Sequence, residues 1–393
     1  MVPFKFEVVH QSRISRARVG RIYTPHGIID TPHFVPVGTN ATVKTLDSKT
    51  VERAGVQLMF CNTYHLLLHP GAETVAAAGG LHKFMNRTQP IITDSGGFQV
   101  FSLAYGTVHD ELKGRVKSKG NGAQSGSIIK ITEDGVLFRS YRDGSPILLT
   151  PESSVRAQHM LGADTIIPLD ELPPYHIDRQ KLRASFDRTH RWEKRSLDEH
   201  LKNKNSNSYL QPVQTASTDQ AMYAVIHGGL DQDLRAESVT ILSREAFDGF
   251  AIGGSFGKNH HDMITMLTHL MPLMPQDRPN HLLGMGDPKS IPHIVSLGID
   301  TFDSSYPTRC ARHGLLFTHA GPLNLTRSEH KRSFVPVDST CTCHTCAHYT
   351  RAYLHHLFKA REMTGLMLAT VHNVYAIAQL MREYRQKILD DLV

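Results

Sequence analysis

The stretch Ile91-Ile92-Thr93-Asp94-Ser95-Gly96-Gly97 shows the pattern that decides the fold, a short apolar run that ends directly in polar residues. The same pattern recurs along the chain. The eight runs are residues 34–37, 58–61, 91–93, 165–169, 223–226, 250–252, 282–283 and 301–302. Continuous apolar runs are typical of strands that are buried on both faces, as in parallel sheets.

Amphipathic segments lie between many of these runs. Thr150 suits a helix N-cap and Pro151 suits the first helical position, so residues 153–161 are expected to be helical. Residues 182–201 also carry apolar side chains at helical spacing. Eight strands that alternate with helices predict the α/β class and a TIM (β/α)8 barrel, with an open doubly wound sheet as the alternative.

Three further segments interrupt this alternation. Residues 113–127 are rich in Gly, Lys and Ser and predict a surface loop. Residues 128–151 contain two Asp-Gly turns, at Asp134 and Asp143, and predict an inserted antiparallel β element. Residues 202–220 are polar and are expected to form a loop.

Composition limits the function classes. The 393 residues are 40% hydrophobic and 20% charged, which argues against a largely disordered chain. No apolar run approaches the roughly 20 residues of a membrane helix, and residues 1–7 lack a secretory signal, so we expect a cytoplasmic protein that does not engage a membrane. The formal charge of +6 is compatible with an anionic partner but does not require one.

Three of the five cysteines lie within six residues, in Cys341-Thr-Cys343-His-Thr-Cys346. Three thiols and one histidine would close a tetrahedral structural zinc site that leaves no position for a substrate. The candidate fourth ligands are His344, His348, His355, His356 and His372; the position of His344 between two thiols disfavours it. The alternative is three incidental buried cysteines. Nearby Arg327, Lys331 and Arg332 make this part of the chain basic.

Three carboxylates follow predicted strands directly, namely Asp94, Asp170 and Asp303. Taken singly, each is more often a helix cap than a catalytic group. In a TIM barrel all three would lie on the rim where active sites form. Three like charges on one rim are costly unless they are used, which favours an active site.

A longer set of segments carries a family resemblance. It comprises residues 62–66, 94–99, 169–171, 227–229, 251–254, 284–286, 302–303 and 307–309, with Cys341, Cys343, Cys346 and His372. With these segments in this order, the chain resembles the bacterial type of tRNA-guanine transglycosylases, which are also called queuine tRNA-ribosyltransferases. The resemblance implies one TIM-barrel catalytic domain over residues 1–393, with a zinc-binding subdomain at residues 325–375, and selects His372 as the fourth ligand.

The resemblance also implies the reaction. Such enzymes replace guanine at the wobble position of GUN-anticodon tRNAs (Asp, Asn, His, Tyr) with a free 7-deazaguanine, either queuine or 7-aminomethyl-7-deazaguanine, in queuosine modification. Asp303 would be the nucleophile that forms a covalent ribosyl-enzyme, and Asp94 the general acid and base. One structural Zn2+ and a homodimer are implied as well.

The remaining residues of the expected site fall into two groups. Those expected to bind the base are Ser95, Gly97, Phe98, Asp170, His227, Gly228, Gly254 and Lys258. Those expected to bind RNA are Gly284, Met285, Gly286, Thr308, Arg309 and Arg312. For Phe98 a place in the core is the equally weighted alternative to stacking on the base.

The base pocket departs from the family at three positions. His227 stands where the family has Gln, Lys258 stands where it has Glu in a loop one residue shorter, and Leu172 stands where bacterial members have Cys. These changes leave the choice of base open, and the shorter loop favours queuine. The rival functions are a retaining glycosidase-like barrel enzyme and a non-catalytic RNA-binding partner subunit; the presence of both Asp94 and Asp303 argues against the second.

Overall fold

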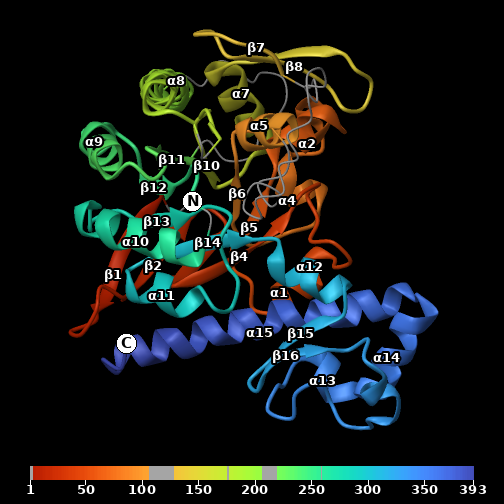
Figure 1. The fold of residues 1–393 in the computed structure, drawn as a ribbon. Coiled ribbons are helices and arrows are strands. Elements are labelled where there is room, and N and C mark those ends of the chain that lie inside the picture. The colour runs from red at the N-terminus through yellow and green to blue at the C-terminus, as the bar shows by residue number, and fades with distance from the viewer. Residues whose placement is uncertain (1–2, 106–127, 175–176, 206–218, 258) are drawn as a thin grey trace.

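The computed structural model describes residues 3–105, 128–174, 177–205, 219–257 and 259–393. Eight parallel strands close into a barrel, and each overlaps one of the eight predicted apolar runs, so the open-sheet alternative is wrong (Figure 1). In barrel order the strands are β4 His33–Gly38, β5 Met59–Cys61, β6 Ile91–Thr93, β10 Thr165–Ile166, β11 Ala221–Ile226, β12 Gly249–Ile252, β13 Asn280–Leu282 and β14 Thr301–Ser304.

The barrel has a packed interior. Alternate strand residues, among them Val35, Ile92 and Val225, point inward and form one apolar cluster. Ile22 and Ile29 from an N-terminal hairpin belong to the same cluster, so the hairpin closes the end where the strands begin. With that end filled, ligands reach the barrel from the opposite end, where the strands finish.

Helices surround the barrel. Helix α7 begins as predicted, because Thr150 accepts a hydrogen bond from the Ser153 amide and Pro151 occupies the first turn. The helices are α1 Ser48–Arg53, α2 Thr63–Leu68, α3 Ala72–Ala77, α4 Gly80–Phe84, α5 Gly97–Tyr105, α7 Pro151–Leu161, α8 Arg179–Asn205, α9 Gln232–Leu242, α10 His260–Leu270, α11 Ile291–Ser296, α12 Tyr306–Arg312, α13 His344–His348, α14 Arg351–Ala360 and α15 Met363–Leu389, with 3-10 turns η1 Met271–Leu273 and η2 Ser328–Arg332.

Two antiparallel sheets flank the barrel, and the inserted one was predicted. The N-terminal sheet consists of β1 Lys5–Gln11, β2 Arg18–Thr24 and β3 Gly27–Thr31. The predicted inserted element consists of β7 Ile128–Ile131, β8 Val136–Arg139 and β9 Pro146–Leu149, with the two Asp-Gly turns between its strands. Phe138 and Val136 from this element pack with Tyr64 beside the barrel mouth.

The expected loop at residues 202–220 begins too early in the sequence. Helix α8 continues to Asn205, so residues 202–205 are helical. Gln220 is buried, and its side-chain amide donates to the carbonyls of Gln158 and Ala163. Residues 206–218 lie outside the described residues, as does the expected loop at 113–127.

The C-terminal part forms a lobe on the barrel. It contains the hairpin β15 Leu315–Thr318 and β16 Gly321–Asn324, together with α13 and α14. Its separate apolar core includes Leu316, Val337 and Leu354. The 27-residue helix α15 begins in this lobe and continues along the barrel (Figure 1). Within the described residues, no helix is both long and apolar enough for a membrane crossing.

Candidate functional site

The carboxyl ends of the barrel strands bring the predicted polar residues to one rim. Asp94 follows β6, His227 follows β11, and Asp303 lies near the end of β14. Asp170 lies four residues beyond β10, after a short extended segment. All of these side chains are largely buried, so their ionisation depends on the few groups that surround them.

Asp94 is held by a complete set of donors. Its Oδ2 accepts hydrogen bonds from Asn62 Nδ2 at 2.7 Å and Gln99 Nε2 at 2.9 Å. Its Oδ1 accepts from the backbone amides of Thr63 at 2.8 Å and Gly96 at 3.2 Å. Burial nevertheless outweighs these bonds and raises the pKa of Asp94. A fixed carboxyl group with a raised pKa suits proton transfer.

Asp170 shares the mouth with Asp94. Ser95 Oγ donates to Asp170 Oδ1 at 3.4 Å. Burial, with the negative charge of Asp94 as the next cause, raises the pKa of Asp170 to about 7. The neighbouring Glu171 faces away and binds Arg188 at 2.7 Å. Within the described residues no Lys or Arg pairs with Asp170, so this carboxyl group is suited to a ligand that donates hydrogen bonds.

The Asp303 side chain is oriented by groups on the neighbouring strand β13 and on the loop that follows β13. His281 Nε2 lies 3.2 Å from Asp303 Oδ1, and the Gly284 amide donates to the same oxygen at 2.8 Å. His281 Nδ1 is 2.9 Å from Thr301 Oγ1, which fixes the ring. These two contacts hold one carboxylate oxygen and fix the orientation of the carboxyl group.

The Asp-Ser-Gly-Gly segment requires its glycines. Gly96 has φ +86, and a Cβ on Gly97 would lie 2.8 Å from the Asp170 carbonyl oxygen. Phe98 follows them and is 47% exposed, so the alternative of a core aromatic is wrong. An exposed aromatic ring next to Asp94 is available for stacking on a base.

The His227 side chain is buried, although it follows a strand at the rim of the barrel. Its Nε2 lies 3.5 Å from both Asp170 Oδ2 and Glu193 Oε1, without a well-aligned hydrogen bond to either. Glu193 comes from α8 and is fully buried. Arg235 lies behind the same loops and donates to backbone carbonyls, including that of Gly253 at 2.7 Å.

A cleft adjoins His227. It lies between the start of α8 and the loops that follow β11 and β12, and most of its lining is apolar. The lining residues are Glu171, Pro173, Pro174, Ile177, Leu182, Ser185, Phe186, Thr189, His227, Gly228, Gly229, Leu230, Gly254 and Ser255. Predicted base-binding residues His227, Gly228 and Gly254 therefore meet here, while Lys258 lies outside the described residues.

Of the residues expected to bind RNA, Gly284, Met285 and Gly286 follow β13, and Thr308, Arg309 and Arg312 lie on α12. Arg309 is exposed in the middle of α12, whereas Thr308 is buried and Arg312 Nη1 donates to the Thr308 carbonyl at 3.1 Å. A Cβ on Gly286 would lie 2.9 Å from the Ser304 side chain, so this glycine serves close packing next to Asp303. Met285 packs against the main core. Of this set, Arg309 and Gly284 are the most accessible.

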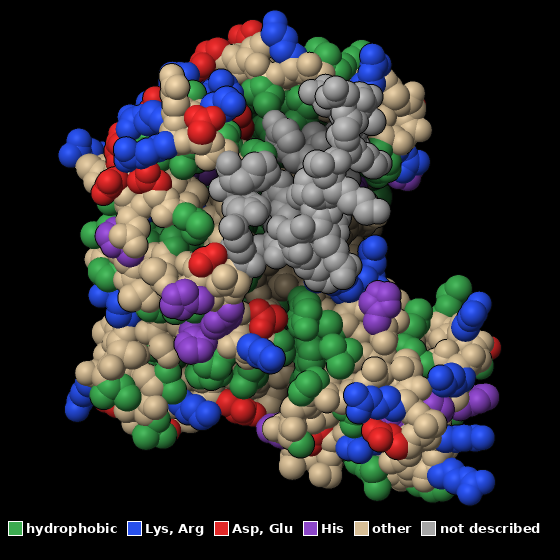
Figure 2. All heavy atoms as spheres, viewed as in Figure 1, with side chains coloured by type: hydrophobic (Ala, Val, Ile, Leu, Met, Phe, Trp, Pro, Cys, Tyr) green, Lys and Arg blue, Asp and Glu red, His purple; other side chains and the backbone are tan. Residues whose placement is uncertain are grey.

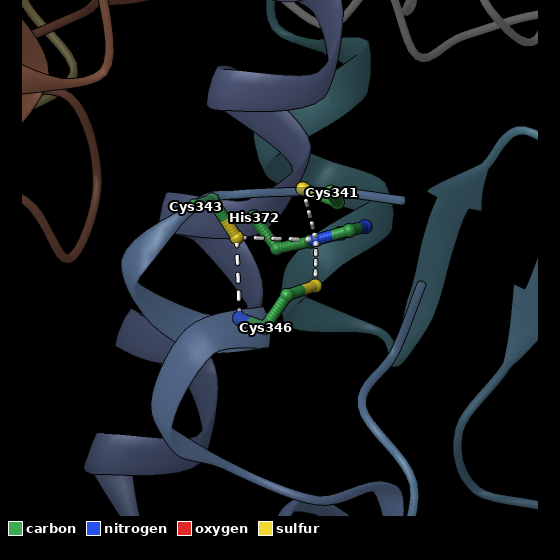
Figure 3. Close-up of side chains that lie close together, drawn as sticks. All are labelled: Cys341, Cys343, Cys346 and His372. Atoms are coloured by element: carbon green, nitrogen blue, oxygen red, sulfur yellow. Dashed lines mark hydrogen bonds between the residues drawn. The ribbon is translucent and has the colours of Figure 1, made fainter. Parts of the chain in front are cut away.

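The three predicted thiols and His372 converge (Figure 3). His372 Nδ1 lies 3.8, 3.5 and 3.3 Å from the sulfurs of Cys341, Cys343 and Cys346. Sulfur and nitrogen ligands at tetrahedral angles around one metal would be about 3.6 Å apart. His372 Nε2 is 2.7 Å from the Phe317 carbonyl oxygen, which fixes the ring with Nδ1 toward the sulfurs. The group fits one metal ion.

Another histidine and carboxylate group lies at the opposite end of the barrel. His26 Nδ1 is 2.8 Å from Asp164 Oδ1, and His26 stacks on His82. Asp164 also accepts from the backbone amides of His26 and Ile91. These contacts attach the β2–β3 turn to the barrel base.

Two residues of the site were missed from the sequence, Glu193 and His281. Gln99 closes the motif at residues 94–99, but its bond to Asp94 was not predicted. His281 was discernible as a polar residue inside a buried strand, Asn280–Leu282. Glu193 offered no signal among the many charges of α8, because only the packing of that helix on β11 brings it to His227.

Comparisons with known proteins agree with this geometry. A family model described as Queuine tRNA-ribosyltransferase matches residues 13–393. A protein of Protochlamydia amoebophila named queuine tRNA-ribosyltransferase is 61% identical over 393 residues, covering 100% of this chain and 97% of the relative. Proteins of the same name from Chlamydia felis and Chlamydia caviae are 51% and 50% identical, each covering 98% of this chain and 99% of the relative.

Proposed function

The chain belongs to the queuine tRNA-ribosyltransferase family, and we propose that the mouth formed by Asp94, Asp170 and Asp303 is where it exchanges guanine in tRNA for a 7-deazaguanine. The exchange is a step of queuosine modification. The observation that supports this location is that one barrel rim carries a fully hydrogen-bonded Asp94 and an oriented Asp303. The activity is tested with tRNA that carries radiolabelled guanine at the wobble position. Addition of a 7-deazaguanine should release the labelled guanine.

Asp303 is proposed as the nucleophile. Its carboxylate oxygen forms a bond to the ribose anomeric carbon while the bond from that carbon to guanine breaks. Asp94 gives a proton to the departing guanine, and it later takes a proton from the incoming base as that base displaces Asp303 from the same carbon. Two displacements at one carbon retain its configuration. The bonds from Asn62 and Gln99 hold the Asp94 carboxyl group in place throughout.

Asp170 is proposed to recognise the edge common to guanine and its 7-deaza analogues. That edge presents adjacent N–H donors, and a carboxylate accepts two such bonds at once. Ser95, Gly97 and the Gly228 backbone are placed around the remaining edge, with Phe98 for the base face. Since the pKa of Asp170 is raised to about 7, a bound base that donates to the carboxylate favours its ionised form.

Zinc is the metal that we propose for Cys341, Cys343, Cys346 and His372. Three thiolates and one imidazole are a common ligand set for structural Zn2+, and they fill its four positions. The lobe that they close carries exposed Arg327, Lys331 and Arg332, and Lys and Arg side chains gather on its surface (Figure 2). The metal thus supports a basic surface for tRNA and takes no part in bond exchange.

Substitution Cys343→Ala is expected to lower the midpoint of thermal unfolding and the soluble yield. A buried thiolate ligand is lost, and the remaining three ligands hold zinc less tightly. The measurements are thermal denaturation and zinc content per chain. Cys310→Ala, which removes a buried thiol that does not belong to the cluster, is the control. A stable Cys343→Ala protein with no zinc and full tRNA affinity would contradict the role.

Queuine is the incoming base that we propose. The cleft beside His227 borders Gly254 and Ser255, on the shortened loop, and we infer that a substituent at position 7 of the base lies along it. Its apolar walls, Pro173, Pro174 and Phe186, suit a cyclopentene ring. Leu172 packs toward the cluster of Tyr64 and Phe138 and is not among the lining residues, so it leaves the cleft open.

We expect a higher kcat/KM for queuine than for 7-aminomethyl-7-deazaguanine on one cognate tRNA. The difference should be about tenfold, the scale of one added apolar group in a pocket. Parallel measurements with both bases on the same enzyme preparation give the ratio. A clear preference for the aminomethyl base would refute the proposal. Leu182→Trp, which fills the cleft, should reduce the kcat/KM of queuine while leaving that of guanine unchanged.

The partners proposed are a GUN-anticodon tRNA, with Arg309 and Arg312 near the phosphates around the wobble base, and a second copy of the chain in a cytoplasmic homodimer. Arg309 is exposed beside the strand that carries Asp303, which supports an RNA contact there.

We also propose that residues 325–375 act as a zinc-binding subdomain of the single catalytic domain. The rival functions, a glycosidase-like enzyme and a non-catalytic subunit, are not favoured by the family membership.

A further inference from the structure

A buried arginine lies behind the proposed base pocket and holds two of its loops. Arg235 belongs to α9 and is 0% exposed. On the loop that follows β11, its guanidinium donates to the carbonyl oxygens of Ile226 at 2.6 Å and Gly229 at 2.9 Å. On the loop that follows β12, it donates to the carbonyl oxygens of Gly253 at 2.7 Å and Ser255 at 3.3 Å. One side chain thus joins the two loops.

The charge of Arg235 is balanced by these carbonyl groups. In the part of the chain that the structure describes, Arg235 forms no ion pair, and burial lowers its pKa to about 9, so it remains cationic at neutral pH. A buried cation is costly unless hydrogen bonds satisfy it, and bonds from a charged donor are stronger than bonds between neutral groups. The four bonds therefore fix the positions of both loops.

The bond to Gly253 also sets the direction of the next amide. In a trans peptide the C=O and N–H groups point in opposite directions. Because the Gly253 carbonyl points at Arg235, the Gly254 amide points away from it. Gly254 lines the cleft, whereas Arg235 does not. The Gly254 amide donates to no acceptor among the described residues, so this donor is available to a ligand.

The position of Gly254 indicates which ligand atom it meets. A Cβ placed on Gly254 would lie 3.9 Å from His227 Nδ1, and His227 Nε2 is 3.5 Å from Asp170 Oδ2. Guanine and its 7-deaza analogues carry a 6-oxo acceptor next to the N–H edge assigned to Asp170. We propose that Arg235 is a positioning residue that aims the Gly254 amide at this oxygen of the bound base. This inference rests on the proposed function of the site.

Substitution Arg235→Lys tests the inference. Lysine keeps the positive charge but lacks the planar fork, so it cannot hold the carbonyls of both loops in fixed directions. We expect the Kd of free guanine and the Kd of free queuine to rise about tenfold, the scale of one buried hydrogen bond. Equilibrium dialysis measures both constants. Unchanged affinity for the two bases overturns the proposal.

The matched control is Arg278→Lys. Arg278 also donates to backbone carbonyls, those of Ser243 at 2.9 Å and Phe247 at 3.2 Å. These lie between α9 and β12, at the end of the barrel where the strands begin. This variant should also lower the midpoint of thermal unfolding, but the Kd of guanine should change less than about twofold. Equal losses of guanine affinity in the two variants indicate a merely structural role and overturn the proposal.

A change in the ligand tests the same contact even if Arg235→Lys does not fold. 6-Thioguanine keeps the N–H edge and replaces the 6-oxo oxygen with sulfur, a weaker acceptor. The wild type should bind guanine about tenfold more tightly than 6-thioguanine, and Arg235→Lys should bind the two within about threefold of each other. Equal wild-type affinities, or a preference that persists in the variant, overturn the proposal. Guanine binding by a wild type that exchanges no guanine in tRNA would instead contradict the proposed function.

Discussion

Substitution Asp303→Asn is expected to abolish base exchange while tRNA binding stays within about threefold of the wild type. The amide has the same size but is not a nucleophile, so no covalent ribosyl-enzyme forms, and the rate should fall by more than about 10³-fold. The backbone amide of Gly284 still finds an acceptor in the Asn carbonyl oxygen. Guanine release in a single turnover and a tRNA gel shift measure the two properties.

The matched control for this variant is His281→Gln. It leaves Asp303 in place and removes the ring that lies 3.2 Å from Oδ1. A positioning role predicts a loss of about tenfold to a hundredfold, well short of that for Asp303→Asn, with the covalent adduct still formed. Turnover near the wild-type rate in Asp303→Asn would transfer the nucleophilic role to another group.

The barrel was predictable because its signal is local. Each strand needs both faces buried, so each appears as a continuous apolar run, and Asp94 and Asp303 follow from where the runs end. The thiols of the metal cluster were equally clear, because three of them lie within six residues. His372 is 26 residues beyond Cys346, and its selection depended on family resemblance.

The environment of the base pocket was not predictable, because it depends on packing between distant segments. Glu193 is 34 positions from His227, and its approach requires one face of α8 to lie on β11. Periodicity places a residue on a helix face but does not identify its partner on the adjoining strand. The high charge of α8 also concealed its last residues, 202–205, which were expected to belong to a loop.

Substitution Asp94→Asn is expected to stop guanine release almost completely. General acid catalysis contributes about 10²–10⁴-fold, and the amide cannot give a proton to the departing base. The four donors around the carboxyl group also oppose an amide, since Asn62 Nδ2 and Gln99 Nε2 both point at Oδ2. We therefore expect lower thermal stability as well, by about 1–3 kcal/mol, and a Gln99→Leu variant calibrates the part due to lost hydrogen bonding.

The pH dependence distinguishes the acid role of Asp94 from a structural one. Burial raises the pKa of Asp94, so its protonated form persists to higher pH than that of an exposed Asp. Protonation of guanine requires this form, which is present below the pKa and lost above it. Single-turnover guanine release by the wild type should thus decline as pH rises through that pKa, and the decline should be missing from the residual rate of Asp94→Asn. A variant that forms the covalent adduct at the wild-type rate would place the action of Asp94 after the attack by Asp303.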